Sequence, residues 1–342
     1  MHTYLFYNDY SEGMHPEVLS ALGTYNDGQE NGYGEDTITR KAVTLLRKHI
    51  GDNEAKIAFV SGGTQANLVV LASLLQPYES VIAPISGHIH VHEAGAIEAT
   101  GHKIETVPTT DGKLTPAMIE KVVTDAMPIH TTKPRAVFIS QATEVGTIYT
   151  KRELTELSAT CRKLGLYLYL DGARLGTALA ASGSDMTLQD IARLVDIFYI
   201  GGTKNGAALG EAIIICNPKL QENFDYHLKQ RGALLAKGRI IAAQFLALFD
   251  GTLYTDLARH ANAMAQKLSK GISAIGHTFL TDSPTNQIFP IFPNTLIDKI
   301  KDRYGFYVWC PVNENTSCIR LVTSWATKEE AVDEFLATLK KL

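Results

Sequence analysis

An acid and a lysine, each placed just after a short apolar run, are the residues of this sequence best suited to chemistry. Asp171 follows the uncharged run at residues 166–170, and Lys204 lies in a loop of small residues after the run at 195–200. Such runs are typical of buried parallel strands, and open α/β sheets bind ligands beyond the carboxyl ends of these strands. We therefore expect the carboxylate and the amine at one edge of a sheet.

The two groups together match the needs of pyridoxal phosphate. A carboxylate can pair with the protonated pyridine nitrogen, which lets the ring accept electrons, and a desolvated lysine amine can form a Schiff base with the cofactor. Gly201, Gly202 and Gly206 would let the cofactor approach the backbone closely. Alone, Asp171 could cap a helix and Lys204 could lie at the surface, but their shared position favours the cofactor.

A strand, a glycine turn and a helix at residues 57–75 could hold the phosphate of such a cofactor. Gly62, Gly63 and Thr64 stand where the helix would begin. The first backbone N–H groups of a helix lack partners within it, and together with the helix dipole they favour an anion. The segment lacks the G-x-G-x-x-G pattern, so it predicts a phosphate site and not a dinucleotide site.

The motifs LDGAR at residues 170–174 and GGTKNG at 201–206 resemble those of the low-specificity L-threonine and L-allo-threonine aldolase family, whose members belong to the beta-eliminating lyases. The resemblance runs from about Tyr7 to the C-terminal helix and includes YGED at 33–36 and IRLVT at 319–323. It implies fold type I of the pyridoxal-phosphate enzymes, an α/β fold similar to that of aspartate aminotransferase.

Two domains are implied by the same resemblance. Residues 1–250 would form a large α/β domain around a mostly parallel, seven-stranded sheet, and residues 251–342 would form a small C-terminal α+β domain. The pattern changes near Gly251, where a long helix is followed by short alternating strand and helix segments. This change agrees with the expected boundary.

The resemblance also implies roles for individual residues. Asp171 would pair with the pyridine nitrogen, Lys204 would form the Schiff base, and His88 would stack on the cofactor ring and could relay a proton. Gly63 and Thr64 would contact the phosphate, with Gly62 beside them. Arg174 would bind the substrate carboxylate and lie at the cofactor. Arg320, between apolar residues in CIRLV, is costly without a paired anion; an internal acid could supply that anion, but the resemblance makes Arg320 the main anchor of the substrate carboxylate.

Three further candidates have weaker support. Asn8 occupies the place where many family members carry a serine that contacts the substrate carboxylate, although an Asn-Asp pair is also typical of a turn. In the loop that begins at Gln141, many members carry a histidine, whereas this chain has Gln141, Thr143 and Glu144. Gln141 or Thr143 could bond the cofactor or the substrate, and the catalytic base stays open. Lys237 could reach a cofactor phosphate in a neighbouring subunit or lie on a solvated helix face.

Composition and charge argue against several other classes of protein. The chain has 342 residues and a formal net charge of −4, with no basic stretch suited to nucleic acid. No run approaches the ~18 consecutive apolar residues of a membrane span, and the N-terminus lacks the pattern of a signal peptide, so we expect a cytosolic enzyme. Its four cysteines lack zinc or disulfide spacing. His88, His90 and His92 lack an evident fourth ligand, and residues 93–100 look helical, so we expect no metal.

The function that the resemblance favours is retro-aldol cleavage of L-threonine, L-allo-threonine and related β-hydroxy-α-amino acids to glycine and an aldehyde, with pyridoxal phosphate as cofactor. A β-eliminating lyase or an aminotransferase would use the same arginines, so Arg174 and Arg320 do not separate these activities. A non-catalytic cofactor-binding protein is disfavoured because Lys204 and Asp171 are both present. The family builds its sites between subunits, so we expect a homodimer or homotetramer with GYGED at the contact.

Overall fold

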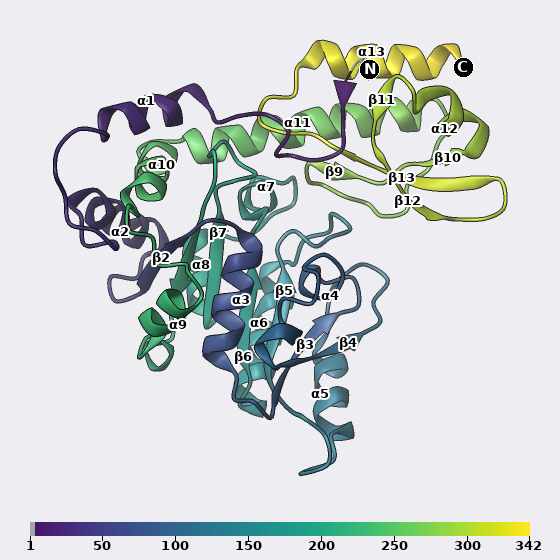
Figure 1. Cartoon of the computed structure of the whole chain (residues 1–342). Coiled ribbons are helices and arrows are strands. Elements are labelled where there is room, and N and C mark those ends of the chain that lie inside the picture. The colour runs from purple at the N-terminus through teal and green to yellow at the C-terminus, as the bar shows by residue number, and fades with distance from the viewer. Residues whose placement is uncertain (1–3) are drawn as a thin grey trace.

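A seven-stranded sheet lies at the centre of the larger part of the molecule (Figure 1). The computed structural model describes residues 4–342. In sheet order the strands are β2 (Lys56–Val60), β8 (Glu211–Ile215), β7 (Ile197–Gly201), β6 (Tyr167–Asp171), β5 (Lys133–Ser140), β3 (Glu79–Pro84) and β4 (Lys103–Val107). Strand β8 runs antiparallel to both of its neighbours, and the remaining pairs are parallel. The mostly parallel sheet expected from the sequence is confirmed.

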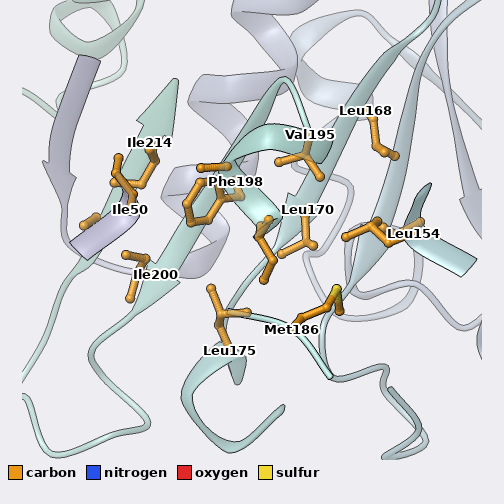
Figure 2. Packing of buried hydrophobic residues seen from close by; sticks show 14 of the residues in the cluster. Ile50, Leu154, Leu168, Leu170, Leu175, Met186, Val195, Phe198, Ile200 and Ile214 are labelled. Atoms are coloured by element: carbon orange, nitrogen blue, oxygen red, sulfur yellow. The ribbon is translucent and has the colours of Figure 1, made fainter. Parts of the chain in front are cut away.

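Both faces of this sheet are buried, and side chains of each strand alternate between the two faces. Leu168 and Leu170 of β6 pack in one apolar cluster, while Tyr169 between them packs in the other. Figure 2 shows the first cluster, in which these two leucines lie with Phe198 of β7 and Leu154. Burying one such side chain contributes roughly 1.5–3 kcal/mol, which explains why the central strands read as uncharged runs.

Helices cover both faces of the sheet. The first cluster includes residues of α1 (Pro16–Thr24), α2 (Thr37–Ile50), α5 (Pro116–Asp125), α6 (Lys151–Leu164), α7 (Leu175–Leu179), α8 (Leu188–Leu194), α10 (Arg239–Phe249) and the start of α11 (Leu253–Ala274). The second includes α3 (Gly63–Leu74), α4 (His88–Val91) and α9 (Phe224–Gln230). Local capping sets several boundaries: Asp36 Oδ1 accepts a hydrogen bond from the Thr39 N–H at 2.6 Å, and Gly51 ends α2 with φ of 67°.

A second region is built around β13 (Thr316–Val322), which pairs with β9 (Gln287–Ile288), β10 (Ile291–Pro293) and β12 (Tyr307–Pro311), all antiparallel. Helices α12 (Asn294–Ile300) and α13 (Glu329–Lys341) belong to this region, and α11 connects it to the large sheet (Figure 1). Strand β1 (Tyr4–Leu5) pairs in parallel with β11 (Tyr304–Gly305), and Phe6 packs in the same apolar cluster as Phe335 of α13. The first described residues therefore lie with the C-terminal region, and the boundary at residue 250 stays a prediction.

Within residues 4–342, no single helix is both long and apolar enough to cross a membrane. Helices α10 and α11 satisfy that test only as a pair, by length and composition, and they are bent by 73° relative to each other. The expected cytosolic location stays a prediction.

Candidate active site

The carboxyl ends of β5, β6 and β7 meet at one edge of the sheet and border a cavity of about 300 Å³. Asp171, the last residue of β6, and Lys204, which follows β7, both line it. A second cavity of about 710 Å³ adjoins the first towards the C-terminal region and is lined by Arg320. His88 and Arg174 line both cavities, so the sheet edge and the C-terminal region share one cleft.

Three donors hold the carboxylate of Asp171, which is only 4% exposed. Its Oδ1 accepts hydrogen bonds from the Tyr199 hydroxyl at 2.5 Å and the Ala173 N–H at 3.0 Å, and its Oδ2 accepts one from Asn67 at 3.1 Å. Such bonds fix the orientation of the carboxylate at the wall of the cavity. Asp171 can therefore receive a cationic ring nitrogen without first having to be ordered.

The amine of Lys204 lies in a setting that favours its neutral form. Burial lowers the pKa of Lys204, and the charge of Arg174 lowers it further, while Asp9, Asp171 and Glu211 oppose the shift. Burial raises the pKa of Glu211, which weakens the opposing effect of this neighbour. A lysine with a lowered pKa has more of the free amine that Schiff-base formation needs.

The glycine turn before α3 forms the wall of the first cavity beside the lysine. Gly62 caps α3 without any side-chain hydrogen bond to the first turn, so the backbone N–H groups of that turn are open to an anion. A Cβ on Gly63 would lie 2.9 Å from the Tyr199 hydroxyl, so only glycine fits there. Thr64 lines the same wall, as does Ser61, which the sequence pattern did not single out. These groups fit the phosphate of pyridoxal phosphate, as Asp171 and Lys204 fit its ring and aldehyde.

His88 is tied to Asp171 through two buried side chains. Its Nδ1 lies 2.7 Å from Glu93 Oε1, which also accepts a hydrogen bond from Asn67 at 2.6 Å. Asn67 in turn donates to Asp171. Burial raises the pKa of Glu93. This chain of contacts fixes the imidazole at the mouth of the cavity, where it can lie against a bound ring.

Arg174 forms a two-point ion pair with Asp9. Its Nε lies 2.8 Å from Asp9 Oδ2 and its Nη2 lies 3.1 Å from Oδ1, while Asn286 donates a hydrogen bond to Oδ2 at 2.9 Å. Burial alone would raise the pKa of Asp9, but the charges of Arg174 and Lys204 lower it below its ordinary value. Asn8, the neighbour singled out from the sequence, instead closes a turn by accepting hydrogen bonds from Tyr10 and Ser11, each at 3.0 Å, and lines neither cavity.

Arg320 lies between two aromatic rings at the far side of the second cavity. Its Cζ is 5.2 Å from the ring centre of Tyr307 and 5.3 Å from that of Trp309, and its Nη2 donates to the Tyr7 carbonyl at 3.3 Å. Its Nε is buried and has no hydrogen-bond partner among residues 4–342. Burial lowers the pKa of Arg320. A guanidinium held by rings and left with a free donor is suited to a carboxylate.

Gln141 and Lys237, two of the predicted cofactor contacts, lie away from this cleft. Both ends of the Gln141 amide bond the backbone of Tyr149, at 2.9 and 3.1 Å, and Gln141 lines neither cavity. Lys237 lines a different cavity, together with Glu30 and Arg239. Glu144, from the same loop as Gln141, does line the cleft. The described residues contain no group of three or more His, Cys, Asp or Glu side chains placed to hold a metal ion.

Known proteins resemble this chain over most of its length. The family model of the beta-eliminating lyases matches residues 9–294. A low specificity L-threonine aldolase from Pseudomonas sp. (strain NCIMB 10558) is 37% identical over 339 residues, which are 98% of this chain and 96% of that protein.

Among solved structures, that of a threonine aldolase from Leishmania major superposes with a TM-score of 0.97 at 46% identity, covering 99% of each chain. An aspartate aminotransferase from Thermus thermophilus, a single mutant, superposes with a TM-score of 0.74 at 15% identity, covering 100% of this chain and 92% of the other. The second likeness shows the fold alone, which is fold type I. The chain belongs to the beta-eliminating lyase family of pyridoxal-phosphate enzymes.

Proposed function

We propose that this protein is a pyridoxal-phosphate-dependent aldolase that cleaves L-threonine, L-allo-threonine and related β-hydroxy-α-amino acids to glycine and an aldehyde. The observation that carries the cofactor and the amino-acid substrate is the cleft that Lys204 and Asp171 line with two arginines, Arg174 and Arg320. The choice of aldolase over the other amino-acid activities rests on the relatives. The Pseudomonas and Leishmania proteins, named as threonine aldolases, support it through their similarity over nearly the whole chain.

The sheet edge would hold the cofactor. Asp171 would pair with the pyridine nitrogen, the first turn of α3 would bind the phosphate, His88 would lie against the ring, and Lys204 would attach it covalently. When bound, pyridoxal phosphate accepts the electron pair released when a bond to Cα breaks. The fixed carboxylate of Asp171 would keep the ring nitrogen protonated, which would sustain this electron-accepting character.

The arginines would place the substrate. Arg320 has a free Nε and would bind the α-carboxylate at the far side of the cleft, with Arg174 as its nearer partner. Asp9 holds the guanidinium of Arg174 in two places, so its orientation is set before substrate arrives. Substrate binding between the two regions would then fix the Cα–Cβ bond relative to the cofactor, since each region supplies one side of the cleft.

The active form would be a homodimer or homotetramer that shares its sites between subunits. Two features support this: Tyr33 in the GYGED segment is 50% exposed, and Lys237 lines a surface cavity with Arg239 that lies apart from the cleft. In a subunit contact, Lys237 would reach the phosphate of the neighbouring site. Sedimentation at assay concentration tests this part, and a fully active monomer would contradict it.

A substrate panel tests the proposed reaction. Protein loaded with pyridoxal phosphate is given L-threonine, L-allo-threonine, L-phenylserine and L-serine, and the aldehydes, pyruvate, ammonia and 2-oxo acids that form are measured. An aldolase releases acetaldehyde from the first two and benzaldehyde from the third. A 2-oxo acid released together with free ammonia, such as pyruvate from L-serine, would instead identify a β-eliminating lyase. A 2-oxo acid formed without free ammonia would identify an aminotransferase.

A further inference from the structure

The loop after β5 places a carboxyl group in the cleft that none of the roles above uses. Glu144 lines both the cavity beside Asp171 and Lys204 and the adjoining cavity of Arg320. Its Oε1 accepts hydrogen bonds from the Ser140 hydroxyl at 2.7 Å and from the His88 N–H at 2.9 Å. One oxygen is therefore anchored at the junction between the cofactor side and the arginine side.

The second oxygen of Glu144 is unsatisfied. Its Oε2 is buried and has no hydrogen-bond partner within the part of the chain that the structure describes. A buried carboxylate oxygen without a donor is costly, so a molecule that brings a donor to this point would be favoured. The β-hydroxyl of a bound β-hydroxy amino acid is such a donor.

The loop that carries Glu144 is held firmly in place. Thr143 and Thr147 exchange backbone and side-chain hydrogen bonds, and the Gly146 carbonyl accepts one from Ser283 of the C-terminal region at 2.9 Å. A Cβ on Gly146, whose φ is 81°, would also collide with the Ser283 side chain. The position of Glu144 is therefore fixed by contacts from both regions.

Other titratable groups of the cleft are less suited to act at the β-position. His88 bonds Glu93 through Nδ1 and is assigned to the cofactor ring, and Glu211 lines the first cavity without reaching the second. His92 lines the second cavity but not the first, and it is exposed. Glu144 is the remaining carboxyl or imidazole that borders both cavities.

The electrostatic surroundings of Glu144 make its carboxylate more basic. Burial raises the pKa of Glu144 and the charge of Asp171 adds to this, while the bonds from Ser140 and His88 work in the opposite direction. Besides Asp171 and His88, the charged or titratable groups lining the same cavities are Tyr10, His92, Arg174, Tyr199, Lys204, Glu211, Tyr307 and Arg320. A carboxylate with a raised pKa is a better proton acceptor than an ordinary one.

We propose that Glu144 is the general base of the cleavage, a role that rests on the proposed aldolase function. Its carboxylate takes the proton of the β-hydroxyl, and the O–H electron pair becomes the second bond of the aldehyde carbonyl. The Cα–Cβ bond breaks, its electron pair stays with the glycine fragment, and a proton from solvent later replaces the lost carbon on Cα. Glu144 then returns its own proton to solvent.

Glu144→Gln tests this assignment, because the amide keeps an acceptor for Ser140 and the His88 N–H but cannot take a proton. We expect kcat/KM for L-allo-threonine and L-phenylserine to fall about 10²- to 10⁴-fold, the usual contribution of a general base. Exchange of the glycine α-proton in D₂O involves no β-hydroxyl and should stay near the wild-type rate. The dissociation constant of pyridoxal phosphate should also be unchanged.

Three results would overturn the assignment: near-normal cleavage by Glu144→Gln, an equal loss of cleavage and glycine exchange, or weakened cofactor binding. His92→Asn is the matched control, and a larger loss of cleavage in that variant than in Glu144→Gln would move the base to His92. The wild-type protein distinguishes a wrong assignment of the base from a wrong assignment of the aldolase function. If it exchanges glycine protons yet releases no aldehyde from any β-hydroxy amino acid, the aldolase function itself is wrong.

Discussion

The two sides of the cleft differ in how their polar groups are satisfied. At the sheet edge, Asp171 already has three hydrogen-bond donors and His88 is bonded to Glu93. Towards the C-terminal region, Arg320 Nε, Glu144 Oε2 and both amide atoms of Gln287 are buried without partners among residues 4–342. Apart from Glu93 Oε2, which is also buried without a partner, the cofactor side is thus organised by the protein itself, whereas the substrate side keeps several groups that a ligand can satisfy.

This difference has a physical consequence for catalysis. The groups of a preformed cofactor side need not rearrange as negative charge develops during the reaction, and fixed charges are most effective under these conditions. Unsatisfied groups on the substrate side instead favour a bound ligand, and Arg320 lies on the separate C-terminal region. Because substrate would contact both regions, we expect KM and kcat to change jointly when this side is altered.

The strongest test of the cofactor side is Lys204→Ala. We expect loss of covalent cofactor attachment and of all aldehyde release, because Lys204 is the lysine that lines the cavity with Asp171. Mass spectrometry after borohydride reduction should show a pyridoxyl adduct on the wild type and on Lys237→Ala, but none on Lys204→Ala. An adduct on Lys204→Ala would assign the Schiff base to another lysine.

Asp9→Asn should destabilise the fold by about 3–5 kcal/mol, because it leaves the largely buried Arg174 without its charged partner. The folded-state pKa of Asp9 is lowered, so its contribution is present above the unfolded pKa of about 3.9 and is lost as the pH falls through the folded value. Free energies of unfolding measured from neutral to acid pH should thus converge for the variant and the wild type. A constant difference down to the lowest pH would contradict the ion pair as its source.

Asp171→Asn should bind pyridoxal phosphate yet lose roughly 10²- to 10³-fold in kcat. The neutral amide keeps the shape of the site but cannot hold the ring nitrogen protonated, and removing one fixed electrostatic group commonly costs this much. Steady-state kinetics and a cofactor titration measure the two properties separately. A near-normal kcat would remove Asp171 from its proposed role.

Arg320→Lys sharpens the comparison from the substrate side. Lysine keeps the charge but loses the planar fork, so hydrogen bonds to a carboxylate worth about 1.5–3 kcal/mol are lost, or roughly 10- to 150-fold in kcat/KM. The cofactor dissociation constant should not change. A large loss of cofactor affinity would mean that Arg320 supports the cofactor side or the fold.

Asn8→Ala should have the smallest effect, because Asn8 forms a local turn and lines neither cavity. Losing two exposed hydrogen bonds should cost no more than about 1–2 kcal/mol of stability, with kcat/KM within a few-fold of wild type. Thermal unfolding and the aldehyde assay measure both quantities. A loss of kcat/KM as large as that of Arg320→Lys would place Asn8 on the substrate after all.

Residues that follow uncharged strands were predictable, and residues that act through distant partners were not. Asp171 and Lys204 were found because buried strands place their ends at one edge. Asn67 was missed, since only folding brings it within 3.1 Å of Asp171. The ion pair of Asp9 with Arg174 was also missed. The Asn-Asp dipeptide is typical of a turn, and in the structure Asn8 forms that turn while Asp9 binds the arginine.

The prediction of secondary structure was wrong where the backbone conformation does not follow the pattern of side chains. Residues 93–100 looked helical, but Ala94 and Gly95 have φ of 52° and 75°, and only Glu98–Thr100 forms a short 3-10 helix. Strand β12 was also missed, because none of its side chains is buried and it shows no apolar alternation. The fold type and the seven-stranded sheet were nevertheless predicted correctly from the family motifs.

The most direct test of the central claim is the product balance from L-allo-threonine. Wild-type protein loaded with pyridoxal phosphate is incubated with this amino acid, and glycine and acetaldehyde are quantified together by NMR. The cleft described above predicts equal amounts of the two products, with none formed by Lys204→Ala. Consumption of L-allo-threonine without glycine, or formation of a 2-oxo acid in its place, would contradict the assignment of this protein as an aldolase.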